Sequence, residues 1–399
     1  MGNISISNRD ENMQESPIRK LAPFAQNAKS RGIHVYHLNI GQPDIRTPDE
    51  MIKAYHNIPP VIEYGPSEGS LSYRKKLVEY YNKVNIQVDE SNIFITTGGS
   101  EAIIFTLLSA LSPGDEVIIP EPFYTNYNGF AVMTGVNIVP VTTTIETGFD
   151  RPEISEFISK LTVRTKAILI CNPGNPTGAV FSREKLQELV DFARENNLYI
   201  ISDEVYREFT YDGVKATSIL EFDNFEENAI MIDSISKRYS ACGSRIGNIV
   251  TRNKELLKLI LKFGQARLCP PSIDQQAAEA AVNVPDSYFE EVITEYDKRR
   301  NLAYEELSKI DNVIVSKPKG AFYMILELPI DDADDFAKWL LSDFNVDNET
   351  TMVAPISDFY ATLGLGKNQV RIAYVLKSED LVKAIHILKL GLEEYKRTH

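Results

Sequence analysis

The chain has 399 residues, of which 43% are hydrophobic and 25% charged, and its formal net charge is −14. This composition is that of a folded globular protein of about two or three domains, and it excludes collagen-like, disordered and disulfide-scaffold proteins. The acidic balance also argues against a protein that binds nucleic acid or an anionic membrane without specificity.

The cysteines and histidines do not form a metal-binding pattern. The three cysteines have no C-x-x-C spacing, and the five histidines show neither H-x-x-x-H nor H-E-x-x-H, so we expect no metal site and no disulfide framework.

The first 30 residues are polar and carry charges of both signs, which is unlike a signal peptide. The longest nearly apolar run, Ile103–Leu111, is too short to span a bilayer. We therefore expect a cytoplasmic protein.

The N-terminal 20 residues read as a mobile arm, with a helix predicted to start at Ser16 as cap and Pro17 as first residue. From about residue 90 to 250, short apolar strands alternate with helical stretches, and each strand ends in a turn rich in Gly, Pro, Asn or Asp. Strands are predicted at Ile93–Thr96, Glu116–Ile119, Ala167–Cys171, Leu198–Ser202 and Ala229–Ser234, and helices at Ser100–Leu111 and Arg183–Asn196.

Strands that alternate with helices indicate an α/β fold with a mostly parallel central sheet covered by helices on both faces. After about residue 297 the pattern changes to a smaller α+β domain. It is predicted to contain the segments Tyr288–Ser308, Val313–Val315, Gly320–Leu328, Asp334–Asp343, Val370–Val375 and Glu379–Lys396. We expect an arm and part of the small domain in residues 1–44, a large domain in 45–297 and the remaining small domain in 298–399.

Two polar turns follow strands of the predicted sheet. In Thr96-Thr97-Gly98-Gly99-Ser100, a strand passes into a helix whose first N–H groups could hold a phosphate, although an ordinary capped helix start explains the same residues. Asn172-Pro173-Gly174-Asn175-Pro176-Thr177-Gly178 directly follows the apolar strand Ala167–Cys171. A plain loop accounts for its Pro and Gly residues, but not for an asparagine held between prolines.

Two further turns carry charged side chains at the same edge. Asp203 ends a very apolar strand, where a carboxylate is costly without a cationic partner, and Tyr206 follows it. Lys237 lies in Ser234-Ile235-Ser236-Lys237, with Arg245 eight residues later. A lysine near a second cation is a candidate for Schiff-base chemistry because the neighbouring charge favours the free amine. Together these groups meet the needs of pyridoxal phosphate: a phosphate cradle, an acid, ring-oxygen donors and an amine.

On these motifs, the sequence resembles the class I/II aminotransferases, fold-type I pyridoxal-phosphate enzymes that include bacterial aspartate aminotransferases. The resemblance runs from about Leu38 to Arg371. Its most specific elements are the Asn-Pro-Gly-Asn-Pro-Thr-Gly turn, the Asp203-x-x-Tyr206 pair, and Ser234-x-Ser236-Lys237 followed by Arg245.

The resemblance implies a role for each matching residue toward the cofactor. Lys237 is expected to attach pyridoxal 5′-phosphate as a Schiff base and then to move the proton, and Asp203 is expected to pair with the pyridine nitrogen. Asn175 and Tyr206 would bind the ring oxygen, with Tyr124 stacked on the ring. The phosphate ligands implied are Gly99, Ser100, Ser234 and Arg245.

The resemblance also implies how substrate binds and how subunits assemble. Arg371 matches the arginine that binds the substrate α-carboxylate, and Gly41 and Asn175 lie beside the substrate. Tyr64 matches a tyrosine that reaches the phosphate of the neighbouring subunit, so we expect a homodimer. The expected reaction is a ping-pong transfer of an amino group from an L-amino acid, with aspartate favoured, to a 2-oxo acid such as 2-oxoglutarate.

The identity of the donor stays open in the sequence. Bacterial relatives often carry a lysine on the helix after the phosphate loop to bind the distal carboxylate of aspartate, and Ile103–Leu111 has no basic residue. Arg267 is a candidate for that charge, across a dimer interface, and an interface arginine with a purely structural role is equally compatible. Arg19 on the N-terminal arm is a second candidate.

Other functions are compatible with parts of the pattern. A lyase on the same scaffold would break a different bond at Cα, and dependence on a 2-oxo acid distinguishes the two. A non-catalytic regulator that binds the cofactor would need a DNA-binding segment, for which the residues before 40 are too few and the net charge has the wrong sign. A nucleotide-binding enzyme would need G-x-G-x-x-G or G-x-x-x-x-G-K-[ST] after a strand, and neither is present.

Overall fold

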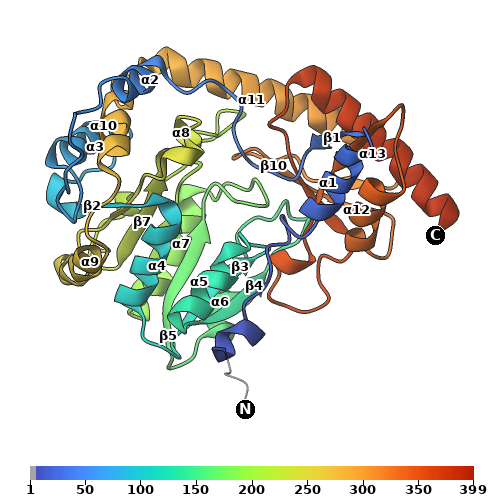
Figure 1. Cartoon of the computed structure of the whole chain (residues 1–399). Helices are drawn as coiled ribbons and strands as arrows, with labels where there is room; N and C mark the ends of the chain where they lie inside the picture. Colours follow the sequence, from blue (N-terminus) through green and yellow to red (C-terminus); the bar gives the residue numbers. More distant parts are fainter. Residues whose placement is uncertain (1–5) are drawn as a thin grey trace, which may run out of the picture.

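The computed structural model describes residues 6–399, and the central feature is a seven-stranded sheet (Figure 1). The order across the sheet is β2 (Ile93–Thr96), β8 (Gly247–Val250), β7 (Ala229–Ser234), β6 (Tyr199–Asp203), β5 (Thr165–Cys171), β3 (Glu116–Glu121) and β4 (Asn137–Thr142). Only β8 is antiparallel to its neighbours β2 and β7. The predicted fold class, a mostly parallel α/β sheet, is therefore confirmed.

Both faces of this sheet are buried, which explains the nearly continuous apolar strands. In β5, Ile168 and Ile170 pack into a core on one face, while Ala167 and Leu169 pack into a second core on the other. The helices of the first core are α3 (Leu71–Lys83), α6 (Ile154–Lys160), α7 (Arg183–Glu195) and α10 (Ser272–Ala281). Those of the second core are α4 (Gly98–Ala110), α5 (Asn126–Thr134) and α9 (Lys254–Arg267).

Helix α7 illustrates how the sequence specifies such an element. Ser182 caps it by accepting a hydrogen bond from the backbone N–H of Lys185. Its buried residues Leu186, Leu189, Val190 and Ala193 recur with the i, i+3, i+4, i+7 spacing of one helical face. That face packs against the sheet, and the charged face is left to solvent.

A third core lies in the smaller part of the molecule, on the right of Figure 1. There β10 (Tyr323–Glu327) lies between β13 (Gln369–Ala373) and β9 (Ile314–Val315), and β12 (Ala354–Pro355) pairs with β13. A separate parallel pair joins β1 (His34–His37) to β11 (Glu349–Met352). The helices here are α1 (Ala22–Ser30), α12 (Ala333–Ser342) and α13 (Ser378–Thr398), and α11 (Asp286–Leu307) runs along the top of Figure 1 toward them.

The remaining short helices are α2 (Asp49–Tyr55), which packs on α10, and α8 (Ile235–Arg238), which follows β7 directly. Strands β4 and β8 were not predicted. Strand β4 carries an internal proline, Pro140, and β8 follows a Gly-rich turn and is separated from β7 by the four-residue α8 instead of a long helix, so neither fits the repeating pattern.

The predicted helix start at Ser16 is wrong. Residues 17–21 form a turn, in which the N–H groups of Arg19 and Lys20 donate to the Ser16 carbonyl, and α1 begins only at Ala22. Pro23 in the first turn of α1 is the proline that starts this helix. Residues 1–5 of the predicted mobile arm lie outside the described residues.

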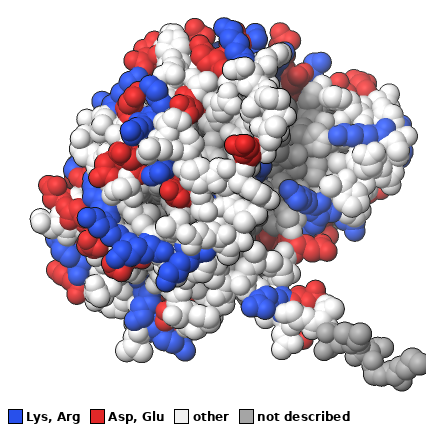
Figure 2. All heavy atoms as spheres, turned by 60° about the vertical axis from the view of Figure 1, so that its left-hand side comes forward, with Lys and Arg blue, Asp and Glu red and all other residues white. Residues whose placement is uncertain are grey.

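The charged residues on the face in Figure 2 are mixed in sign, and a hollow separates the larger body from the smaller lobe. Within residues 6–399, every helix is too short or too polar to cross a lipid bilayer.

Candidate active site

A cavity of about 320 Å³ lies beyond the carboxyl ends of the parallel strands. It gathers side chains from β5, β6 and β7, from the start of α4, from the N-terminal segment and from the smaller lobe. Of the predicted site residues, its lining contains Arg19, Gly41, Gly99, Ser100, Tyr124, Asn175, Asp203, Tyr206, Ser234, Lys237, Arg245 and Arg371.

The start of α4 and the turn after β7 form a cradle for an anion. Helix α4 begins at Gly98, which has φ = 77°, and a Cβ there would lie 2.3 Å from Nη2 of Arg245. The Arg245 guanidinium is thus packed against the helix start, where free N–H groups already favour negative charge. The hydroxyls of Ser234, at the end of β7, and Ser236, in α8, are 2.9 Å apart. This donor set fits a phosphate.

Asp203 lies at the end of β6, and only 5% of it is exposed. The Tyr127 hydroxyl donates to its Oδ2 at 2.7 Å, and no cation contacts it among residues 6–399. Burial is the main cause that raises the pKa of Asp203 to about 6. A protonated ring nitrogen of the cofactor would be the cationic partner that this carboxylate lacks.

Lys237 reaches into the same cavity from α8. Its Nζ donates to the Gly41 carbonyl at 2.8 Å and lies 3.7 Å from Cys242 Sγ. A Cβ on Gly41 would overlap the Tyr323 hydroxyl, so glycine is needed for this close approach. Within residues 6–399 these two contacts are the partners of the amine and neither is a carboxylate, which leaves it available for covalent chemistry.

Arg371 enters from β13 and is 1% exposed. Its Nη1 donates to Asn175 Oδ1 at 3.0 Å and its Nη2 to the Asn39 carbonyl at 2.6 Å, while Nε has no partner among the described residues. Desolvation is the main cause that lowers the pKa of Arg371. A buried guanidinium with a free donor and no carboxylate beside it is suited to bind the carboxylate of a ligand.

Three tyrosines form part of the cavity wall. The Tyr206 and Tyr323 hydroxyls are 2.8 Å apart, and the Tyr323 ring lies 4.5 Å from the Arg371 guanidinium carbon. Tyr124 is held by a hydrogen bond from Asn126 Nδ2 to its hydroxyl at 2.7 Å, and burial is the main cause that raises its pKa to about 12.

The cavity also contains residues that the sequence did not single out for it. Gln42, Cys171, Cys242 and Tyr323 line it, and Tyr127 supports Asp203 from behind. Tyr127 is three residues after Tyr124 at the start of α5, so the helical spacing could have indicated that both side chains face one side. Tyr323 carried no such signal because it is an ordinary apolar-strand residue until the fold brings its hydroxyl to that of Tyr206.

Two predicted site residues lie outside the cavity. Tyr64 is 82% exposed and lines a separate hollow with Cys269 and Ser272. Arg267 points into its own subunit, where Nη2 donates to the Ser67 carbonyl at 3.2 Å and Nη1 lies 3.6 Å from Glu101 Oε2. The described chain therefore does not bring either residue to the Lys237 cavity by itself.

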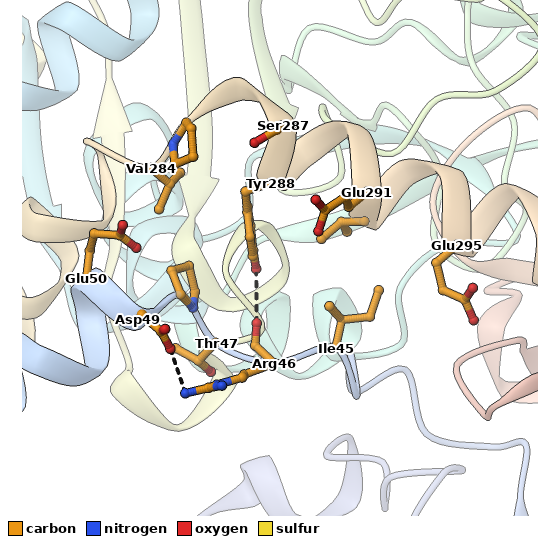
Figure 3. A pocket seen from close by; sticks show the side chains of 13 residues that line it. Ile45, Arg46, Thr47, Asp49, Glu50, Val284, Ser287, Tyr288, Glu291 and Glu295 are labelled. Carbon is orange, nitrogen blue, oxygen red and sulfur yellow. Dashed lines mark hydrogen bonds and ion pairs between the residues drawn. The ribbon is translucent and has the colours of Figure 1, made fainter.

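A larger cavity of about 540 Å³ lies between residues 45–50 and 284–295 (Figure 3). Four carboxylates line it, from Asp49, Glu50, Glu291 and Glu295. Its one cation, Arg46, already pairs with Asp49 at 2.6 Å. This charge is wrong for a phosphate or a carboxylic acid, so the strand-end cavity is the better site for such ligands.

Comparisons with known proteins agree with this geometry. The family model for aminotransferase class I and II matches residues 33–388. The chain is 33% identical to aromatic-amino-acid aminotransferase 2 of Thermococcus litoralis, over 98% of this chain and 100% of that protein. It is 33% identical to an aspartate aminotransferase of Pyrococcus abyssi, over 99% and 100%.

Solved structures give the same result. An alanine aminotransferase from Pyrococcus furiosus matches with a TM-score of 0.89 and 30% identity, over 98% of this chain and 100% of that one. A mutant aspartate aminotransferase of Thermus thermophilus matches with a TM-score of 0.88 and 27% identity, over 98% and 100%. Because the fold, the donor set of the cavity and both comparisons coincide, this chain belongs to the class I and II aminotransferases and is a pyridoxal-phosphate-dependent aminotransferase.

Proposed function

We propose that the enzyme moves the amino group of a dicarboxylic L-amino acid, with L-aspartate favoured, to a 2-oxo acid such as 2-oxoglutarate by a ping-pong mechanism. The observation that carries this proposal is the set of four cations around one cavity, Arg19, Lys237, Arg245 and Arg371, against the single carboxylate Asp203. Such a site attracts a phosphate and substrates with more than one carboxylate. Relatives named as aspartate aminotransferases support the same choice.

The residues of the cavity divide into those that hold the cofactor and those that hold substrate. Arg245, Ser234, Gly99 and Ser100 would bind the phosphate, and Tyr124 would lie against the ring. Bound pyridoxal phosphate supplies an electron sink for the charge that develops at the substrate Cα. Asp203 would keep the ring nitrogen protonated, and Tyr206 and Asn175 would donate to the ring oxygen.

Lys237 is the proposed covalent anchor and the proton-transfer group. Its Nζ is held by the Gly41 carbonyl, on the segment that also borders the substrate. Arg371 would bind the α-carboxylate and so present the Cα hydrogen to Lys237. One positioned amine can then serve as base and as acid in the two proton transfers.

Arg19 is the better candidate of the two for reading the distal carboxylate. It lines the cavity, and no hydrogen bond or ion pair of its guanidinium is present in the described part of the chain. Arg267 is instead engaged by Glu101, by backbone carbonyls and by the Phe105 ring within its own subunit. Ile18, Ile40 and Ile103 line the same cavity and would pack on the carbon chain of the substrate.

The active form is proposed to be a homodimer. Tyr64 is exposed on a segment with other exposed apolar residues, Ile58, Val61 and Ile62. Covering that segment with a second copy would bring Tyr64 toward a neighbouring phosphate site.

We also propose that the chain divides into domains at residues 1–44, 45–297 and 298–399, with the smaller domain free to close on substrate.

The test is a titration of the visible absorption band of the cofactor-loaded enzyme, first with L-aspartate and then with 2-oxoglutarate. The band is expected to disappear with aspartate and to return with the oxo acid. Arg19→Gln should raise the aspartate concentration needed by about tenfold or more and leave L-alanine unaffected, since alanine has no distal carboxylate. Lys237→Ala should abolish both changes.

Other results would redirect the proposal. A band that aspartate leaves unchanged, but a neutral or aromatic amino acid removes, would exclude the dicarboxylate preference. Product formation without any 2-oxo acid would indicate a lyase. Near-normal turnover by Lys237→Ala would rule out the proposed role of that lysine.

A further inference from the structure

A cluster of buried charged residues lies directly behind the active site. We name it the buried charge cluster, and it consists of Glu204, Arg207, Glu208, Asp233 and Arg238. Glu204 follows Asp203 in the chain, Asp233 precedes Ser234, and Arg238 follows Lys237. In β7, Asp233 and Ser234 point to opposite sides because neighbouring residues of a strand alternate. Glu204 follows the last residue of β6 and Arg238 lies in α8, and the side chains of both form ion pairs within the cluster.

Arg238 is the centre of the contacts on the β7 side. It is 2% exposed; its Nη2 donates to Asp233 Oδ2, and its Nε donates to Glu208 Oε1 at 2.9 Å. Its guanidinium carbon lies 4.1 Å from the centre of the Tyr80 ring. The Arg238 side chain, next to Lys237 in the chain, is thus held by its contacts with Asp233, Glu208 and the Tyr80 ring.

Arg207 extends the cluster to β6. Its Nη2 pairs with Glu204 Oε2 at 3.0 Å, and its Nη1 lies 3.6 Å from Asp233 Oδ2. The backbone N–H of Ile219 and the Ser218 hydroxyl donate to the other oxygen of Glu204, at 2.9 and 3.0 Å. Asp233 therefore pairs with both arginines and joins the end of β7, which leads directly into the α8 helix of Lys237, to the turn after β6.

Helix α8 needs such an anchor because it is only four residues long. A single helical turn is unstable by itself, since it fixes several residues for very few hydrogen bonds. Ser234 caps α8 by accepting from the Ser236 N–H at 3.1 Å, and its own N–H donates to Asp233 Oδ1 at 2.7 Å. Beyond these local bonds, the tertiary ion pairs of α8 come from Arg238.

The energetics of buried ion pairs indicate that the buried charge cluster positions Lys237 rather than stabilises the fold. Two guanidiniums are buried with the carboxylates of Glu204 and Asp233 and with the partly buried carboxylate of Glu208, and burying ion pairs commonly contributes little net stability or even costs some. A mismatch of about 1 Å at a reacting group can cost about a hundredfold in rate. A rigid set of charges behind Lys237 prevents such a mismatch.

We propose that Arg238 is a positioning residue, which ties α8 to Asp233 and Glu208 and thereby holds Lys237 in register with Asp203 across the cavity. The proposal rests on the proposed roles of Lys237 and Asp203. Arg238 itself does not line the cavity, so it acts only through the lysine beside it.

The experiment compares Arg238→Met with Arg300→Met in the cofactor-loaded enzyme. Arg300 is a matched control, because it is fully buried on α11 and pairs at 2.7 Å with both Asp212 and Asp297, away from the cavity. Both variants should unfold at lower temperature than the wild type. Only Arg238→Met should lower kcat, by about 10- to 100-fold, with KM for the amino donor changed by less than about twofold.

Two further readouts separate positioning from loss of fold. In Arg238→Met, the pH at which the cofactor band titrates should shift, and the amides of residues 235–238 should exchange with solvent faster, while Arg300→Met should leave both unchanged. Arg238→Lys keeps the charge but loses the fork that spans two carboxylates, and should lower kcat by about 3- to 10-fold.

The proposal is overturned if Arg238→Met matches Arg300→Met in kcat and in the titration of the band. If Arg238→Met does not fold, Arg238→Lys decides: wild-type kcat and an unshifted band in that variant would also overturn it. Failure of the proposed function looks different, because then the wild type itself would show no amino-acid-dependent loss of the band.

Discussion

Asp203 shows how a single residue can be prepared for a partner that the chain does not supply. Its carboxylate is buried and lies near the carboxylates of Glu204 and Asp233. Among the described residues, it accepts hydrogen bonds from the Tyr127 hydroxyl and, at 3.5 Å, from the Val205 N–H. In the free protein this setting favours the neutral acid. A protonated pyridine nitrogen reverses the preference, because it places a positive charge beside the carboxylate.

The pH dependence of stability follows from the raised pKa of Asp203, which is about 6 in the folded apoprotein. The unfolded chain has the lower pKa, so the folded state binds the proton more tightly, and stability falls as pH rises from about 4 to about 6. Asp203→Asn removes the free-energy cost of ionising a buried carboxyl group. Its free energy of unfolding, relative to the wild type, should rise by about 1–2 kcal/mol between pH 5 and pH 8.

Urea unfolding of the two apoproteins at pH 5 and pH 8 measures this difference. Asp311→Asn, at an exposed position, is the control and should show no such change. A difference between wild type and Asp203→Asn that is the same at both pH values would contradict a buried, proton-retaining Asp203.

At the scale of elements, the site is built from the helix starts and turns that directly follow strands of the central sheet. Helix α4 follows β2 through Thr97 without an intervening loop, and α8 follows β7 in the same manner. Both helices therefore start at the carboxyl edge of the sheet or beside it, with their free N–H groups near the cavity. The Asn175 turn after β5 adds an amide that reaches Arg371 in the smaller lobe.

Gly98 allows the start of α4 to approach Arg245. Gly98→Ala should weaken the binding of pyridoxal phosphate by the apoprotein by about tenfold or more, because the added Cβ would displace the guanidinium and is strained at φ = 77°. An absorbance titration of the apoprotein measures the affinity. Gly114→Ala introduces comparable strain, at φ = 89°, but with nothing within 4 Å.

The control should lose stability, by about 1 kcal/mol, while its cofactor affinity stays that of the wild type. Equal affinities for all three proteins would show that the phosphate does not bind between α4 and Arg245.

At the scale of the whole molecule, the N-terminal segment connects the two lobes over the site. Gln14 accepts a hydrogen bond from Asn128 on α5, while Lys20 pairs with Asp334 and Asp358 in the smaller lobe. Ile18 and Arg19 lie between these anchors and line the cavity. The segment is thus part of the cavity wall, which a mobile arm would not be.

The exposed apolar segment around Tyr64 should form the subunit interface. Ile62→Glu is expected to convert a dimer of about twice 45.0 kDa into a monomer and to weaken cofactor binding, although Ile62 lies far from Lys237 in its own chain. Light scattering after size-exclusion chromatography gives the mass. Val163→Glu is the control, because Val163 is 94% exposed outside this segment.

Val163→Glu should remain dimeric with normal cofactor affinity. A wild type that is monomeric at all concentrations, or a monomeric Ile62→Glu with undiminished affinity, would contradict a site completed by the second subunit.

The sequence by itself determined the fold class, five of the seven strands of the central sheet and most of the predicted members of the cavity. Strand ends are local signals: Asp203, Asn175 and Lys237 each follow an apolar run, and parallel strands must bring their carboxyl ends to one edge. The nearly exact bounds of β2, β7 and α7 have the same origin in local pattern, whereas the helix placed at Ser16 failed because Pro23 offered an equally good start.

Only the tertiary structure decided which side chains meet across large separations in sequence. The sequence put Arg267 ahead of Arg19 as the candidate for the distal carboxylate, but packing turned Arg267 toward Glu101 and left Arg19 at the cavity. The contact of Tyr323 with Tyr206 and the buried charge cluster likewise join residues far apart in the chain. Such contacts depend on the packing of whole elements, and the direction of a side chain after packing is not encoded in its immediate neighbours.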